Sequence, residues 1–127
     1  MAYVELVILL AIFEYMVLGT LVARARGKYG VRAPAITGHP VFDRTFRVQQ
    51  NTLEGLVIFL PGLWLFGQYQ NPLWAAGLGV AGIVGRALYA AGYIRGAEKR
   101  GPGAGICGIV NVVLVVGALI GVIRTLV

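Results

Sequence analysis

Long apolar segments alternate with short polar connections along the chain. Four blocks are mainly hydrophobic: residues 2 to 23, 46 to 70, 73 to 95 and 104 to 126. An α-helix rises 1.5 Å per residue, so about 20 residues cross a bilayer core of about 30 Å. Each block is therefore long enough for one transmembrane helix. The pattern predicts an all-α integral membrane protein whose single domain, residues 1–127, is a four-transmembrane-helix bundle.

Composition and charge placement agree with a membrane location. Of the 127 residues, 58% are hydrophobic and 13% are charged, whereas about 25% are charged in an ordinary soluble domain. The net charge of +6 does not indicate a nucleic-acid partner, because the cations gather in or beside the first and third connections. An excess of Lys and Arg marks cytoplasmic loops. We expect loops 1 and 3 in the cytoplasm, both termini on the opposite side, and a bacterial inner membrane.

Helix-breaking residues fill the first connection, residues 24–45. Three glycines and two prolines punctuate it: Gly27, Gly30, Pro34, Gly38 and Pro40. Such residues disfavour regular structure, so we expect no helix there. Glycines also recur at short helical spacings in the third and fourth blocks, where small residues let helices approach closely. This second pattern fits either packing within one bundle or an interface between subunits.

Polar side chains share one helix face at the start of the second block. Arg47, Asn51 and Glu54 follow the i, i+4, i+7 spacing, with Gln50 beside them, whereas Gln49 points elsewhere. A charge in hydrocarbon costs about 2.5 to 3.5 kcal/mol on insertion scales. The stripe should therefore face protein or water. It predicts either an internal network, with Arg47 paired to Glu54, or a ligand site.

The third block repeats this arrangement in GRALYAAGYIRGAEKR. Arg86, Tyr89 and Tyr93 share one face, and Arg100 falls on the same line if the helix continues to it. Cations outnumber carboxylates around the two stripes: Arg44, Arg47, Arg86, Arg95, Lys99 and Arg100 face only Asp43, Glu54 and Glu98. Arginine binds carboxylates with a two-point fork, and a glutamate suits an ammonium group. Glutathione has this outline, as do an amino acid conjugate and a lipid headgroup.

The two stripes carry a family resemblance. RVQQNTLEGLVIFLP resembles the second-helix signature of the MAPEG family, the membrane-associated proteins in eicosanoid and glutathione metabolism, and GRALYAAGYIRGAEKR resembles its third-helix signature. The resemblance implies a homotrimer of four-helix bundles that binds glutathione as a cosubstrate between subunits, among membrane lipids. The glutathione-binding positions that it implies are Arg26, Arg47, Gln49, Asn51, Glu54, Tyr89, Tyr93 and Arg95.

The resemblance also implies a catalytic residue. Arg100 matches an arginine assigned to thiol activation, with Arg95 in a supporting role. Free thiols have a pKa of about 8.5, and a guanidinium in contact favours the thiolate. Gly55 and Gly27 depart from the leukotriene-forming members, which have a tyrosine and an arginine there. The expected function is a glutathione transferase, with or without peroxidase activity, that acts on lipophilic electrophiles.

Two other functions remain open. The chain could be a lipid-binding MAPEG member without thiol chemistry, or a small multidrug transporter that uses Glu14 in the first block. The simplest interpretation of Glu14 is a polar contact to a neighbouring helix, and that of Cys107 is a small residue packed in the fourth helix. We expect His39 to be a solvated loop residue. No motif for a metal site or a serine nucleophile is present.

Overall fold

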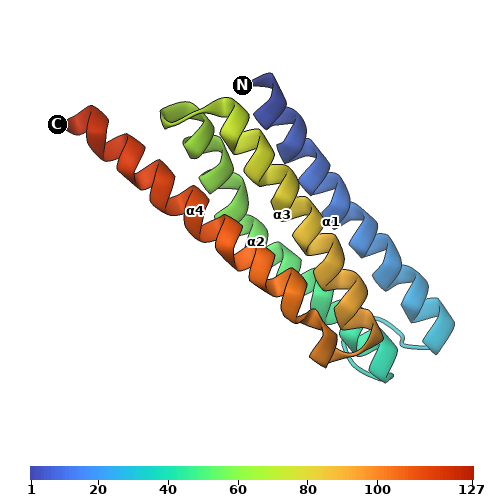
Figure 1. Ribbon diagram of the computed structural model, residues 1–127. Helices are drawn as coiled ribbons and strands as arrows, with labels where there is room; N and C mark the ends of the chain where they lie inside the picture. Colours follow the sequence, from blue (N-terminus) through green and yellow to red (C-terminus); the bar gives the residue numbers. More distant parts are fainter.

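Four helices form an antiparallel bundle in the computed structural model, which describes residues 1–127 (Figure 1). They are α1 (Ala2–Tyr29), α2 (Pro40–Tyr69), α3 (Pro72–Arg95) and α4 (Gly101–Leu126), and a short 3₁₀ turn, η1 (Ala97–Arg100), precedes α4. Residues 30–39 and η1 lie at one end of the bundle, and both termini lie toward the other. This confirms the predicted all-α four-helix bundle. We call the first of these ends the loop end.

The predicted limits of the first connection are wrong. α1 continues to Tyr29 and α2 already begins at Pro40, so helix covers most of residues 24–45. Gly30 closes α1 in the left-handed conformation with φ 68°, which glycine adopts without a steric cost. Pro40 occupies the first turn of α2, where a missing N–H does no harm. These breakers therefore end and begin helices instead of preventing them.

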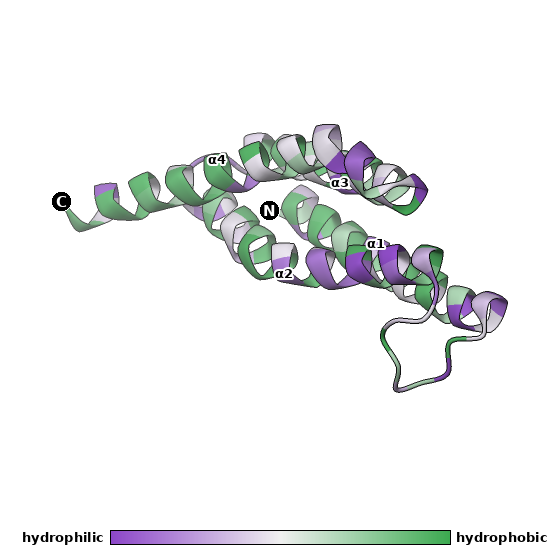
Figure 2. Ribbon diagram, turned by 90° about the horizontal axis from the view of Figure 1, so that it is seen from below, coloured by the Kyte–Doolittle hydropathy of each residue, from purple (hydrophilic) through white to green (hydrophobic).

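Three of the four helices are long and apolar enough to cross a membrane: α1, α3 and the segment Ala97–Leu126 that contains α4. α2 has 30 residues, but its first half carries Asp43, Arg44, Arg47 and Glu54. Hydropathy alone therefore does not mark α2 as a span, and a fourth span over residues 46–70 stays a prediction. Figure 2 shows apolar residues over most of α4 and hydrophilic ones concentrated toward the loop end.

The closely spaced glycines serve packing inside the bundle. A Cβ on Gly82 would lie 2.6 Å from the Phe59 ring, and one on Gly117 would overlap the Phe66 ring. Gly121 likewise lies against Tyr69. Small residues thus let α3 and α4 approach α2, as in other membrane bundles. Of the two interpretations that the sequence left open, these contacts favour intramolecular packing.

Candidate functional site

The two polar stripes meet inside the bundle. Asn51 Nδ2 on α2 donates a hydrogen bond of 2.6 Å to the Tyr89 hydroxyl on α3. Tyr89 is 6% exposed and packs with Leu18 and Val48 near the loop end. A buried phenol needs a hydrogen-bond partner, and Asn51 supplies it. Residues that are 38 positions apart in the sequence therefore form one site.

Aromatic and cationic side chains extend this site along α3. The Tyr89 and Tyr93 rings lie 5.6 Å apart, Arg86 Cζ lies 4.9 Å from the centre of the Tyr89 ring, and Arg100 Cζ lies 5.8 Å from that of Tyr93. These distances are in the range of cation–π contacts. α3 ends at Arg95, so Arg100 does not continue its face. The η1 turn brings Arg100 back to Tyr93.

Contacts to backbone carbonyls hold the η1 turn and the end of α3 in place. Gly92 packs on the Lys99 carbonyl, where a larger residue would overlap it. Arg100 Nη1 donates to the Ala97 carbonyl at 2.6 Å, and Arg44 Nε on α2 donates to the Ile94 carbonyl at 3.0 Å. A guanidinium has five N–H donors, so both arginines retain donors for another group. The loop end of the site is thus held in place and rich in free cationic donors.

Arg47 and Glu54 lie on the outward face of α2 and are exposed. Glu54 is seven positions after Arg47, about 10 Å along a helix, which is farther than the i+3 or i+4 spacing at which helical ion pairs form. This geometry speaks against the internal pairing that the sequence left open. The stripe therefore has an inner part, at Asn51, and an outer part that the single chain leaves uncovered.

Three predicted binding residues lie apart from the Asn51–Tyr89 contact within one chain. Arg26 Nη1 donates to the Ala35 carbonyl at 2.6 Å, and its guanidinium lies 4.9 Å from the Phe42 ring centre, so Arg26 fastens the loop. Gln49 faces α1, since its Nε2 lies 3.1 Å from where a Gly19 Cβ would be. This confirms that Gln49 points away from the stripe. Arg95 is exposed at the end of α3.

His39 also differs from its expected solvated role. Its ring stacks on Tyr29 with 4.0 Å between ring centres. His39 Nδ1 accepts a hydrogen bond from the Val41 N–H at 3.1 Å, which caps α2. The residue therefore helps to join the two ends of the first loop. Capping by histidine is not a signal that sequence reasoning would select, because Ser, Thr, Asp and Asn are the usual caps.

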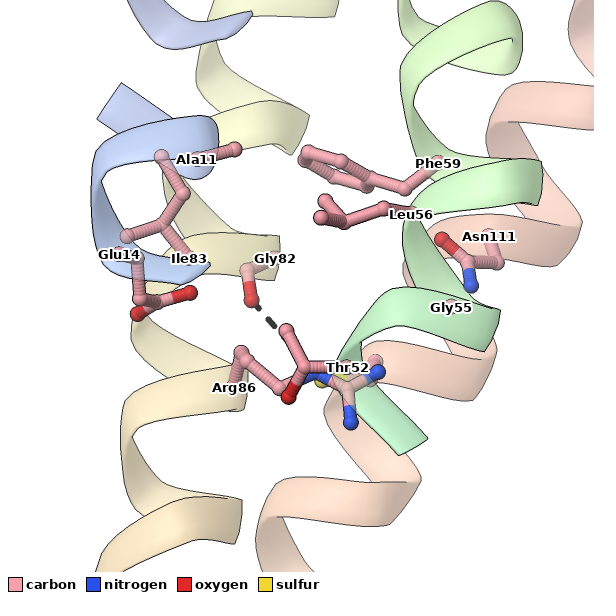
Figure 3. A pocket seen from close by; sticks show the side chains of 11 residues that line it. Ala11, Glu14, Thr52, Gly55, Leu56, Phe59, Gly82, Ile83, Arg86 and Asn111 are labelled. Atoms are coloured by element: carbon pink, nitrogen blue, oxygen red, sulfur yellow. Dashed lines mark hydrogen bonds between the residues drawn. The ribbon is translucent and has the colours of Figure 1, made fainter. Parts of the chain in front are cut away.

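A small cavity in the middle of the bundle was not foreseen from the sequence. All four helices line it, and Figure 3 shows Glu14, Thr52, Arg86 and Asn111 among its polar side chains. Cys107 also borders it, and its Sγ lies 3.9 Å from the Gly82 carbonyl. The expectation that Cys107 is buried is confirmed. Glu14 lines this cavity, but it makes no hydrogen bond within the chain, so its polar contact to a neighbouring helix stays a prediction.

Comparison with known proteins identifies the family. Residues 4–120 match the model of the MAPEG family. The chain belongs to the MAPEG family. It is thus an integral membrane protein, and the resemblance of its two helix signatures is confirmed. The structure holds no group of three or more His, Cys, Asp or Glu residues that could bind a metal ion.

Individual relatives span bacteria and animals. An uncharacterized protein of Synechocystis is 51% identical over 93% of this chain and 86% of its own length. Human microsomal glutathione S-transferase 2 is 46% identical over 77% of the chain and 67% of its own length. Guinea pig leukotriene C4 synthase is 39% identical over 62% of the chain and 53% of its own length. This MAPEG chain is therefore similar to a microsomal glutathione S-transferase, to a leukotriene C4 synthase and to an uncharacterized bacterial protein.

Proposed function

We propose that this protein is a membrane-embedded glutathione transferase. The Asn51–Tyr89 hydrogen bond carries the proposal, because it joins the two polar stripes into one site at the loop end. Around it, Arg44, Arg86 and Arg100 are only partly engaged by the chain itself. Guanidinium N–H groups that have no partner within the chain favour a ligand with carboxylates. The named relatives include glutathione S-transferases.

Each group has a proposed task. Arg47 and Glu54 bind the charged ends of glutathione, with Arg26, Gln49 and Arg95 as further contacts, and Asn51, Tyr89 and Tyr93 hold its peptide part. Arg100 is the catalytic residue: its guanidinium stabilises the glutathione thiolate, because a positive charge lowers the pKa of a nearby thiol. The thiol proton is released to water, and the thiolate sulfur then forms a C–S bond with a lipophilic electrophile from the bilayer and displaces its leaving group, such as chloride. Glutathione is a cosubstrate, and no metal takes part.

The uncovered outer stripe supports assembly with further copies. Arg47 and Glu54 are exposed on α2 among apolar side chains such as Leu53, Val57 and Ile58, which are 43%, 69% and 49% exposed. Charges at membrane depth are placed against protein or water and not against lipid. A homotrimer would cover this face and complete the site with Arg26 and Gln49 of a neighbour. We also propose that the protein lies in a bacterial inner membrane. The excess of Lys and Arg then places loops 1 and 3 in the cytoplasm.

The test is a titration of detergent-solubilised protein with glutathione while thiolate absorbance is followed in the near ultraviolet. We expect thiolate at neutral pH in the parent and its loss in Arg100→Ala. Arg124→Ala is the matched control, because Arg124 is an exposed arginine in the last turn of α4. It should behave like the parent. Conjugation of a chlorinated aromatic electrophile should likewise be retained in the parent and in Arg124→Ala and lost in Arg100→Ala.

Three results would overturn the proposal in different ways. If the parent forms neither thiolate nor conjugate and Arg100→Ala changes nothing, the chain is a lipid-binding MAPEG member without thiol chemistry. If the folded parent protein binds no glutathione, the cationic site serves another anion. Efflux activity abolished by Glu14→Gln would instead revive the transporter.

A further inference from the structure

The cavity in the bundle centre has a polar end that faces the proposed glutathione site. Its volume is about 20 Å³, enough for about one water molecule. Figure 3 shows Phe59 and Leu56 at the apolar end, and Glu14 and Arg86 at the other end. Arg86 is one helical turn from Tyr89 on α3. The polar end is therefore adjacent to the Asn51–Tyr89 contact.

Glu14 and Arg86 lie deep inside their helices. Glu14 is twelve residues after the start of α1, and Arg86 is fourteen after the start of α3, which corresponds to roughly 18 and 21 Å of helix. Glu14 is the carboxylate and Arg86 the guanidinium of the cavity wall. Ionisable groups at this depth pair with one another or face water. The two opposite charges are thus natural partners.

Glu14 and Arg86 both line the cavity and have polar atoms without a partner in the chain. No hydrogen bond within the chain engages either side chain, and no fully buried side-chain nitrogen or oxygen lacks a partner, so the polar atoms of both residues are accessible to water. Asn111 on α4 adds an amide to the same wall. A buried water typically makes about three hydrogen bonds to such groups. The cavity therefore has both the size and the partners for one bridging water.

The position of Arg86 depends on the residues around it. A Cβ on Gly55 would lie 2.5 Å from Arg86 Nη2, so the absence of a side chain at residue 55 gives the guanidinium its place. From there it lies over the Tyr89 ring, with 4.9 Å from Cζ to the ring centre. Arg86 thus connects the cavity to a residue of the proposed site.

We propose that Glu14 and Arg86 form a water-bridged ion pair across this cavity, which holds Arg86 against the Tyr89 ring and so positions Tyr89 for glutathione. Both are positioning residues and neither touches the thiol. This inference rests on the proposed function. Removal of one charge leaves the other unpaired, whereas removal of both leaves no unpaired charge.

A double-mutant cycle tests the pair. The variants are Glu14→Gln, Arg86→Met and the two together, each titrated with glutathione in detergent. We expect each single variant to raise the Kd about tenfold, and the double variant to stay near tenfold instead of reaching the hundredfold of independent sites. The thiolate formed at saturation should stay unchanged in Glu14→Gln, since Arg100 is intact. Glu14→Asp should recover most of the affinity.

Glu5→Gln is the matched control, because Glu5 is an exposed glutamate in the first turn of the same helix. It should leave the Kd and thermal unfolding unchanged. A hundredfold effect in the double variant, or an unchanged Kd in Glu14→Gln, would overturn the inference. If the parent binds no glutathione, the proposed function fails, and thermal unfolding then tests the ion pair alone. A loss of stability in the double variant equal to the sum of the losses in the two single variants would overturn the ion pair.

Discussion

The side-chain amide of Asn51 on α2 donates a hydrogen bond to the hydroxyl of Tyr89 on α3, 2.6 Å away. A tyrosine hydroxyl is both acceptor and donor. Because Asn51 uses the oxygen as acceptor, the O–H of Tyr89 is left free to donate to another group. The contact thus fixes the direction of a donor in the proposed glutathione site, in addition to joining two helices.

Removal of this donor should weaken glutathione binding. We expect Tyr89→Phe to raise the Kd about two- to tenfold, because one hydrogen bond contributes about 0.5–1.5 kcal/mol. Thiolate absorbance during a glutathione titration measures it. Tyr3→Phe is the control, since Tyr3 is 65% exposed near the N-terminus. An equal loss in both variants would show that the phenol of Tyr89 has no specific role.

Arg26 should determine how well the first loop is ordered. Its guanidinium donates to the carbonyl of Ala35 and lies over Phe42, so Arg26→Met keeps an apolar stem but loses these donors. We expect faster trypsin cleavage after Arg32, which is exposed in the loop. Limited proteolysis followed by mass spectrometry measures the rate. Arg24→Met, on an exposed position of the same helix, should cleave like the parent; equal acceleration would contradict the role of Arg26.

Local geometry explains what the sequence could predict. The face shared by Arg86, Tyr89 and Tyr93 follows from helical periodicity alone, and their contacts confirm it. The cavity could not be predicted, because Glu14 and Arg86 are brought together only by the packing of α1 against α3. The predicted limits of the first connection were wrong for a different reason. Glycine and proline are also capping residues, and composition does not tell a cap from an interruption.

The outward face of α2 should be a subunit interface. Ile58 lies one turn from Glu54 and is 49% exposed. The control residue is Ile123 on α4, which is 48% exposed and has Arg124 as the only charged residue near it on that helix. We expect Ile58→Trp to shift the detergent-solubilised protein from the proposed trimer toward monomer, since a larger side chain blocks a packed interface. Ile123→Trp should leave the mass unchanged. Light scattering that gives the same mass for Ile58→Trp and the parent would argue against this interface.

The contact between α3 and α4 should be sensitive to a single methyl group. A Cβ on Gly103 would overlap the backbone nitrogen of Tyr89 and lie 2.7 Å from the Gly85 carbonyl oxygen. Backbone atoms cannot rotate away, so Gly103→Ala must separate the helices, at a cost of about 1–3 kcal/mol. We expect a lower Tm and weaker glutathione binding, because Tyr89 moves with its backbone.

Gly105→Ala, on the same helix, should not lower the Tm. Nothing lies within 4 Å of its Cβ position, and alanine is favoured over glycine in a helix by up to about 1 kcal/mol. Its Tm in thermal unfolding should therefore equal or exceed that of the parent, with an unchanged Kd for glutathione. If Gly103→Ala matched Gly105→Ala in both measurements, α3 and α4 could not be packed as closely at Tyr89 as the structure places them.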